Sequence, residues 1–238
     1  MKLLKHWDDN NWLSSKKYID AFCVFVSKQV QIHKSTRVLD IGCGRGKITG
    51  AFKRKFKLLN KPIGIDIIHH QDKDKDIEFK KTDIFNYLKK NKKPLDLILI
   101  KQTIHFFNPT QIKKLLKLCK NNLSPQGVIL IFSLETHRNQ IPCFALMKSK
   151  LQQGLRRDIT IQKIISKSLS KLTKKKFHYQ VGVSRTKYIE MIKKKYISCL
   201  LDLSQDEINQ GIQEIQNQNE SYLKFKDTLI SMRYTKIK

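Results

Sequence analysis

A chain of 238 residues with 40% hydrophobic and 9% aromatic residues is long enough to bury a full core and is typical of a globular protein. No apolar run approaches the roughly 20 residues that a membrane-spanning helix needs, which excludes a transmembrane protein. The net charge of +28 favours an anionic partner such as nucleic acid, an acidic membrane surface or an acidic substrate, although a general lysine bias of the chain explains it equally well.

The five cysteines are scattered through the chain and form no C-x-x-C pair. This spacing predicts neither a metal site nor a disulfide framework, and it favours a reducing compartment. The first nine residues mix lysines and aspartates with apolar residues and do not form the apolar core of a secretory signal. We therefore expect a cytoplasmic protein.

The N-terminal segment predicts a capped helix. Ser14 or Ser15 is the expected N-cap of a helix over residues 16–30, in which Tyr18 and Phe22 recur at helical spacing. Trp12 precedes this helix, as does Trp7. The two tryptophans are expected to anchor the core, and the alternative makes Trp12 or Tyr18 part of a lid that excludes water from a site.

Residues 37–49 predict a strand, a tight turn and the start of a helix. An apolar run ends in Asp40, and Gly42, Gly44 and Gly46 follow at alternate positions before a helix-compatible segment over residues 50–59. Such a unit opens an α/β sheet and carries its ligand site at the carboxyl end of the strand. The spacing differs from the G-x-G-x-x-G pattern of dinucleotide-binding folds.

Four further strands are predicted downstream, over residues 62–67, 79–84, 95–100 and 127–132. Asp66 and Asp83 end or follow two of them, and an acid at such a strand end can accept both hydroxyls of a ribose. Between them, His69, His70 and the alternating charges of residues 72–76 predict an exposed loop, and we expect no metal there.

The C-terminal third predicts inserted helices before and between the last two strands. Helices are expected over residues 141–172 and 186–195, and another over 205–216 with Ser204 as its N-cap and Glu207 at the third position. The last strands are expected at residues 177–183 and 222–234. Residues 148–195 hold fifteen Lys and Arg against two acids, 15 − 2 = +13.

The pattern D-x-G-x-G-x-G from Asp40 to Gly46 resembles motif I of the class I S-adenosylmethionine-dependent methyltransferases. The resemblance implies an α/β fold, a Rossmann-like, seven-stranded, mostly parallel twisted sheet with helices on both faces. It also implies S-adenosyl-L-methionine as cofactor. On this resemblance the cofactor-binding residues are Asp40, Gly42, Cys43, Gly44, Gly46, Asp66, Ile67, Thr82, Asp83, Ile84 and Lys101.

His105-Phe106-Phe107 follows the fourth strand and is similar to the signature of small-molecule methyltransferases like trans-aconitate methyltransferase. His105 is thus the candidate catalytic residue, with a hydrogen-bonded structural histidine as the alternative. The other candidate substrate-binding residues are Trp12, Tyr18, Arg138, Arg156 and Arg185, since a guanidinium can hold a carboxylate with two hydrogen bonds.

These observations predict methyl transfer to a small-molecule acceptor, an organic acid or another anionic metabolite. The alternative is an RNA- or ribosome-associated methyltransferase that uses the basic surface. We expect one domain over residues 1–238, with an N-terminal helical cap (1–36), a cofactor-binding core (37–135) and acceptor-cover helices with the last two strands (136–238). A monomer or homodimer is expected.

Overall fold

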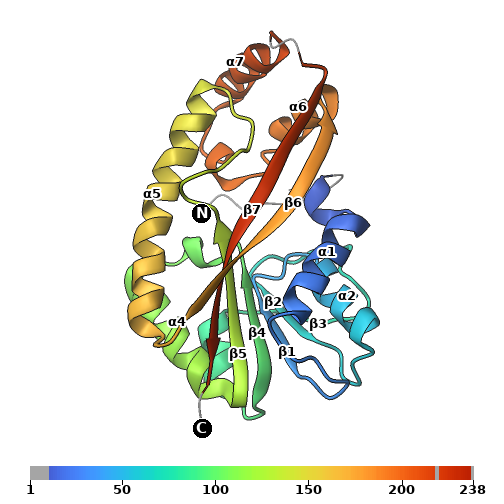
Figure 1. The fold of residues 1–238 in the computed structure, drawn as a ribbon, viewed down its shortest axis with the longest axis vertical. Coiled ribbons are helices and arrows are strands. Elements are labelled where there is room, and N and C mark those ends of the chain that lie inside the picture. The colour runs from blue at the N-terminus through green and yellow to red at the C-terminus, as the bar shows by residue number, and fades with distance from the viewer. Residues whose placement is uncertain (1–10, 218–219, 237–238) are drawn as a thin grey trace. The chain divides into compact units, whose positions relative to one another are not determined.

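The computed structural model describes residues 11–217 and 220–236 (Figure 1). Trp7 lies outside the described residues. The chain forms two compact units, and each is described by itself. The larger unit comprises the described residues within 19–134, 160–177 and 229–238, and the smaller unit those within 1–18, 135–159 and 178–228. The single domain with boundaries near 36 and 135 stays a prediction.

A seven-stranded sheet in the order β3-β2-β1-β4-β5-β7-β6 organises the fold. Its strands are β1 (Val38–Ile41), β2 (Ile63–Asp66), β3 (Glu78–Lys81), β4 (Leu95–Lys101), β5 (Leu123–Leu134), β6 (Thr173–Ser184) and β7 (Tyr222–Thr235). Strands β3, β2, β1, β4 and β5 pair in parallel, and β7 pairs antiparallel with β5. The predicted seven-stranded, mostly parallel sheet is confirmed.

The helices include the five predicted ones, most of them with shifted bounds, and others besides. They are η1 (Trp12–Ser14), α1 (Lys16–Ser27), α2 (Lys47–Phe56), α3 (Ile84–Lys90), η2 (Ile104–Phe106), α4 (Pro109–Asn122), α5 (Ala145–Ser168), α6 (Arg185–Lys193), η3 (Ser198–Leu200) and α7 (Gln205–Gln216). Within residues 11–217 and 220–236, no helix is both long and apolar enough to cross a membrane.

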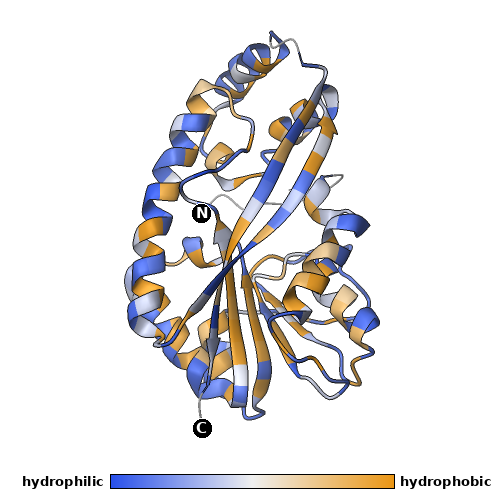
Figure 2. Ribbon diagram, in the orientation of Figure 1, coloured by the Kyte–Doolittle hydropathy of each residue, from blue (hydrophilic) through white to orange (hydrophobic). Residues whose placement is uncertain are grey.

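Alternate residues of the central strands serve two separate cores in the larger unit. On one face, Ile98 and Ile129 pack in a cluster with residues of α3, α4 and the C-terminal half of α5. On the other face, the ring of Phe132 lies 4.7 Å from the ring of Phe22 in α1. Figure 2 shows β4 and β5 as almost continuously hydrophobic ribbons, as expected of parallel strands that are covered on both faces.

Several element boundaries differ from the predictions. Strands β5 and β6 begin four residues before their predicted starts, and α5 begins and ends four residues inside its predicted range. Helix α2 begins at Lys47, three residues before the predicted start, because Gly46 takes a left-handed backbone with φ of 71° and acts as its N-cap. Asn108 and Pro109 start α4, where Asn108 forms a capping box with Gln111 and Pro109 occupies the first turn. Helix α1 ends at Ser27, three residues early.

Aromatic contacts organise the smaller unit. The ring of Trp12 lies 5.4 Å from Tyr196 and 5.2 Å from Phe225, and the hydroxyl groups of Tyr188 and Tyr196 are 2.9 Å apart. Helix α7 begins with the predicted capping box of Ser204 and Glu207.

Candidate functional site

The glycine-rich loop between β1 and α2 has the left-handed backbone that its sequence requires. Gly42, Gly44 and Gly46 have φ of 71°, 54° and 71°. The amides of Gly42 and Cys43 both donate to the carbonyl of Ile65 at the end of β2, at 2.8 and 3.1 Å. The loop is thereby fixed at the carboxyl ends of two neighbouring parallel strands.

The glycines of this loop face different surroundings. A Cβ on Gly42 would lie 2.3 Å from the hydroxyl oxygen of Thr103, and one on Gly46 would lie 2.1 Å from Ile77. A Cβ on Gly44, by contrast, would meet nothing within 4 Å. Gly44 therefore borders open space, where its bare backbone can approach a ligand closely.

Asp66, the last residue of β2, joins the strand end to this loop. One carboxylate oxygen accepts a hydrogen bond from the amide of Gly44 at 2.9 Å, and the other accepts from the amide of Ile68 at 2.9 Å. Each carboxylate oxygen has a second lone pair, so both can still accept from a ligand's hydroxyl groups. These remaining acceptor positions fit the two ribose hydroxyl groups of S-adenosylmethionine.

Asp40 lies on the buried side of the loop, with 5% of its surface exposed, and accepts a hydrogen bond from the hydroxyl of Thr49 in α2. Burial raises the pKa of Asp40 to about 6. The negative charge of Asp66 also raises this pKa, whereas the hydrogen bond from Thr49 and the positive charge of Lys101 lower it in part. Asp40 thus connects β1 to the first turns of α2 beneath the loop.

The remaining predicted cofactor residues lie around these strand ends. Asp83 is exposed and caps α3 by accepting from the amide of Asn86 at 3.0 Å. The amide of Thr82 donates to the carbonyl of Asp66 at 3.1 Å. The side chain of Ile84 is buried, whereas that of Ile67 is 53% exposed. Burial raises the pKa of the Cys43 thiol.

The charged run of residues 72–76, expected to be a solvated loop, is tied to the glycine-rich loop. Buried Arg45 pairs with Asp72, and the carbonyl of Arg45 accepts from the amide of Asp74 at 2.8 Å. Arg54 in α2 pairs with Asp74 at 2.9 Å. Sequence reasoning missed Arg45 and Thr49, although their positions within and just after the glycine motif were a signal. In the part of the chain that is described, no group of three His, Cys, Asp or Glu could hold a metal ion.

Comparison with known families identifies the family of this chain. The family described as "Methyltransferase domain" matches residues 32–180, which include the whole glycine motif and its partners Asp66 and Thr103. The chain belongs to this methyltransferase family. It is an S-adenosylmethionine-dependent enzyme, and S-adenosyl-L-methionine is its cofactor.

Solved methyltransferase structures share the fold of this chain. An S-adenosylmethionine-dependent methyltransferase from Archaeoglobus fulgidus aligns with a TM-score of 0.52 at 21% identity, covering 92% of this chain and 94% of that one. The plantazolicin methyltransferase BpumL, solved with S-adenosylhomocysteine, gives 0.54 at 18% identity and coverages of 97% and 87%. The N-methyltransferase NodS from Bradyrhizobium japonicum, also with S-adenosylhomocysteine, gives 0.51 at 16% identity and coverages of 97% and 90%. No curated protein sequence matches the chain.

In the methyltransferase, His105 lies in η2, directly after the carboxyl end of β4. Its half-buried ring lies 4.2 Å from the ring of Phe106, which is 39% exposed. The hydroxyl of Thr103 donates to the carbonyl of Lys101 at 3.1 Å, and the same side chain faces Gly42. The candidate catalytic histidine thus follows a segment that contacts the glycine-rich loop.

The other candidate acceptor residues of the methyltransferase lie in the smaller unit. The indole N–H of Trp12 donates to the buried carboxylate of Asp227 at 2.9 Å, and Tyr18 is fully buried. Arg138 and Arg156 are exposed, whereas Arg185 donates to the carbonyl of Gln216 at the end of α7, at 3.1 Å. These contacts give Trp12 and Arg185 structural roles, and binding of an acceptor by any of the five stays a prediction.

Proposed function

We propose that the methyltransferase acts on a small-molecule acceptor, and that this acceptor is an organic acid or another anionic metabolite. The observation that carries the proposal is the half-buried imidazole of His105 beyond the carboxyl end of β4. His105 follows Thr103, whose side chain contacts the glycine-rich loop. An imidazole at a strand end can donate a hydrogen bond to an anionic oxygen of an acceptor.

The residues of the glycine-rich loop would hold the cofactor. Asp66 would accept from the ribose hydroxyls, and the bare backbone at Gly44 would allow close approach. Bound S-adenosylmethionine supplies an electrophilic methyl group on a positively charged sulfur. Alignment and exclusion of water account for most of the acceleration in such transfers, so positioning by the chain is the main catalytic requirement.

The role of His105 depends on the acceptor. A carboxylate is already ionised at neutral pH, and His105 would then orient its oxygen by donating a hydrogen bond. A hydroxyl acceptor must lose its proton, and His105 would then accept that proton as a general base. Phe106 lies against the imidazole and restricts its orientation.

The proposal is tested by supplying labelled cofactor and purified enzyme to a cell extract and resolving the products by mass. We expect the labelled methyl group in an acidic metabolite. Label found only in RNA or only in protein would overturn the proposal.

His105→Gln should lower turnover on that product at least tenfold while cofactor affinity, measured by calorimetry, stays within twofold. Thr110→Ala, at an exposed position in the first turn of α4, is the control and should retain most of the turnover. A fall in both turnover and cofactor affinity in His105→Gln would make His105 a structural residue.

The expected cytoplasmic location and the monomeric or homodimeric state stay predictions. All five cysteines are free thiols, which supports a reducing compartment.

A further inference from the structure

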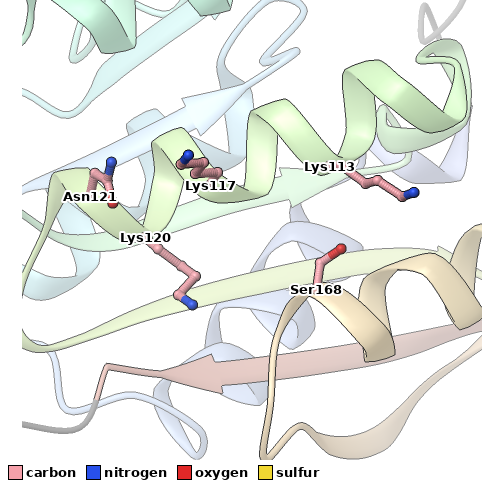
Figure 3. Close-up of a pocket in the computed structure, with 5 residues that line it drawn as sticks. All are labelled: Lys113, Lys117, Lys120, Asn121 and Ser168. Carbon is pink, nitrogen blue, oxygen red and sulfur yellow. The ribbon is translucent and has the colours of Figure 1, made fainter.

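A groove of about 350 Å³ lies between α4 and the C-terminal end of α5, within the larger unit. Lys113, Lys117, Lys120 and Asn121 line it from α4, and Ser168 lies across from them on α5 (Figure 3). The lysines are four and three residues apart, so they share one face of the helix. Cationic groups and neutral hydrogen-bonding groups therefore line the groove.

The two segments that form the groove are basic throughout. Helix α4 holds four lysines and residues 160–177 hold six, 4 + 6 = 10, and neither segment contains an aspartate or glutamate. A concave surface with charges of one sign concentrates counter-ions of the opposite sign. The expected ligand is an anion.

The apolar sides of both helices are already used in the core. Ile112, Leu115 and Leu116 of α4 are fully buried, as is Ile165 of α5, and Leu169, directly after α5, is 1% exposed. A helix that lies on a membrane inserts an apolar face into the lipid, and neither helix has one to offer. This observation disfavours a membrane as the partner.

The groove is separate from the methyl-transfer site. Helix α4 begins at Pro109, just after the carboxyl end of β4, and returns along the sheet to Asn122. The next residue, Leu123, pairs with Leu95 at the start of β4. Lys117 and Lys120 therefore lie toward the amino ends of the strands, opposite the edge that carries the glycine-rich loop.

We propose that this groove binds the phosphate backbone of a nucleic-acid strand. Lys113, Lys117 and Lys120 form a row about 10 Å long, from a rise of about 1.5 Å per residue, which suits a linear row of phosphates better than one small anion. Lysines neutralise phosphates without reading bases. The exposed large apolar residues of the described chain (Val24, Leu59, Ile67, Phe106 and Tyr222) lie outside both segments, so the groove has no platform for stacked bases and binds without regard to sequence.

The test measures binding of a fluorescent 20-nucleotide poly-U RNA by anisotropy between 50 and 300 mM salt. Replacement of Lys113, Lys117 and Lys120 by Gln should weaken binding at least tenfold at 100 mM salt. It should also reduce the slope of log K against log salt by about 2, since each lost contact to a single strand contributes roughly 0.7. Poly-dT of the same length should bind within threefold of poly-U.

The matched control replaces Lys28, Lys34 and Lys55, which are exposed in the same unit on the α1 and α2 side, by Gln. This variant has the same net charge as the groove variant and should bind RNA within twofold of the wild type. Both variants should keep the cofactor affinity and melting temperature of the wild type.

Equal weakening by both triple variants would overturn the proposal, because it would reflect net charge alone. Displacement of the RNA by micromolar tripolyphosphate would instead indicate a site for a small anion and would also overturn it. Tighter binding to vesicles with 30% anionic lipid than to RNA would assign the groove to a membrane surface.

Discussion

The glycine-rich loop of the larger unit and the aromatic cluster of the smaller unit are fixed in this methyltransferase by different means. In the larger unit, backbone geometry and hydrogen bonds fix the glycine-rich loop: Gly42, Gly44 and Gly46 have positive φ, and Asp66 accepts from the amide of Gly44. In the smaller unit, rings pack against rings around Trp12, and the residues that meet are far apart in sequence. A substitution in the loop should therefore act through backbone strain and one in the smaller unit through packing.

The sharpest test of this comparison is a pair of glycine substitutions. Gly42→Ala should lower the free energy of unfolding by about 2–6 kcal/mol, because a left-handed backbone costs a non-glycine residue about 1–3 kcal/mol and overpacking against Thr103 about as much again. Gly154→Ala, in α5 of the smaller unit, should raise it by about 0.5–1 kcal/mol, since its Cβ would meet nothing within 4 Å. Urea unfolding measures both. Equal effects of the two substitutions would contradict the comparison.

The next largest effect is a pH dependence from Asp40. The pKa of Asp40 is about 6 in the folded protein against 3.8 in the reference state, so the folded protein binds more protons between these values and its stability falls as pH rises through that window. At 1.36 kcal/mol per pKa unit, the loss is about 3 kcal/mol and is complete above about pH 7.

Asp40→Asn carries no such charge and retains an oxygen that can accept from Thr49. The wild type should therefore lose free energy of unfolding relative to Asp40→Asn as pH rises. The difference between the two, measured by urea titration, should grow by about 3 kcal/mol from pH 4 to pH 7. A difference that stays constant with pH would show that Asp40 is not destabilised by its burial.

Asp66→Ala tests the loop through ligand binding. The variant loses the predicted ribose contacts and the bond to Gly44, so its affinity for S-adenosylmethionine should fall by about 2 kcal/mol, roughly thirtyfold. Isothermal calorimetry measures this directly, with exposed Asp20→Ala in α1 as a control that should change the affinity little. An unchanged affinity in Asp66→Ala would remove Asp66 from the site.

The smallest expected effect lies in the smaller unit. Trp12→Phe keeps a ring but loses the hydrogen bond to the buried Asp227, and should lower the free energy of unfolding by about 1.5 kcal/mol without changing cofactor affinity. Tyr179→Phe, whose ring lies 5.0 Å from that of Tyr18, is the ring-retaining control and should cost less. Loss of cofactor affinity in Trp12→Phe would contradict its assignment as a structural residue.

The same contrast explains which features could be predicted from the sequence. The loop and the capping box of Ser204 and Glu207 depend on residues a few positions apart, and both were predicted correctly. The start of α2 was misplaced because Gly46 was assigned only to the loop, although it also caps the helix.

Contacts across long sequence separations could not be predicted. Trp12 and Asp227 are 215 residues apart, and Arg45 pairs with Asp72 27 residues away. Periodicity and motif spacing predict which side of a helix or strand is buried, but not which distant residues it contacts. The candidate acceptor residues come from distant parts of the chain, so the sequence supports the cofactor more firmly than the acceptor.

The segment from Asp72 to Ile77 has a consequence for handling the enzyme. It contains Lys73 and Lys75, which would make a mobile loop an early site of tryptic cleavage. Here Arg45, Arg54 and the ammonium of Lys61, which donates to the carbonyl of Lys75 at 2.8 Å, hold the backbone in place. Digestion at these two lysines should therefore be slow in the folded enzyme and should accelerate as salt weakens the exposed ion pairs.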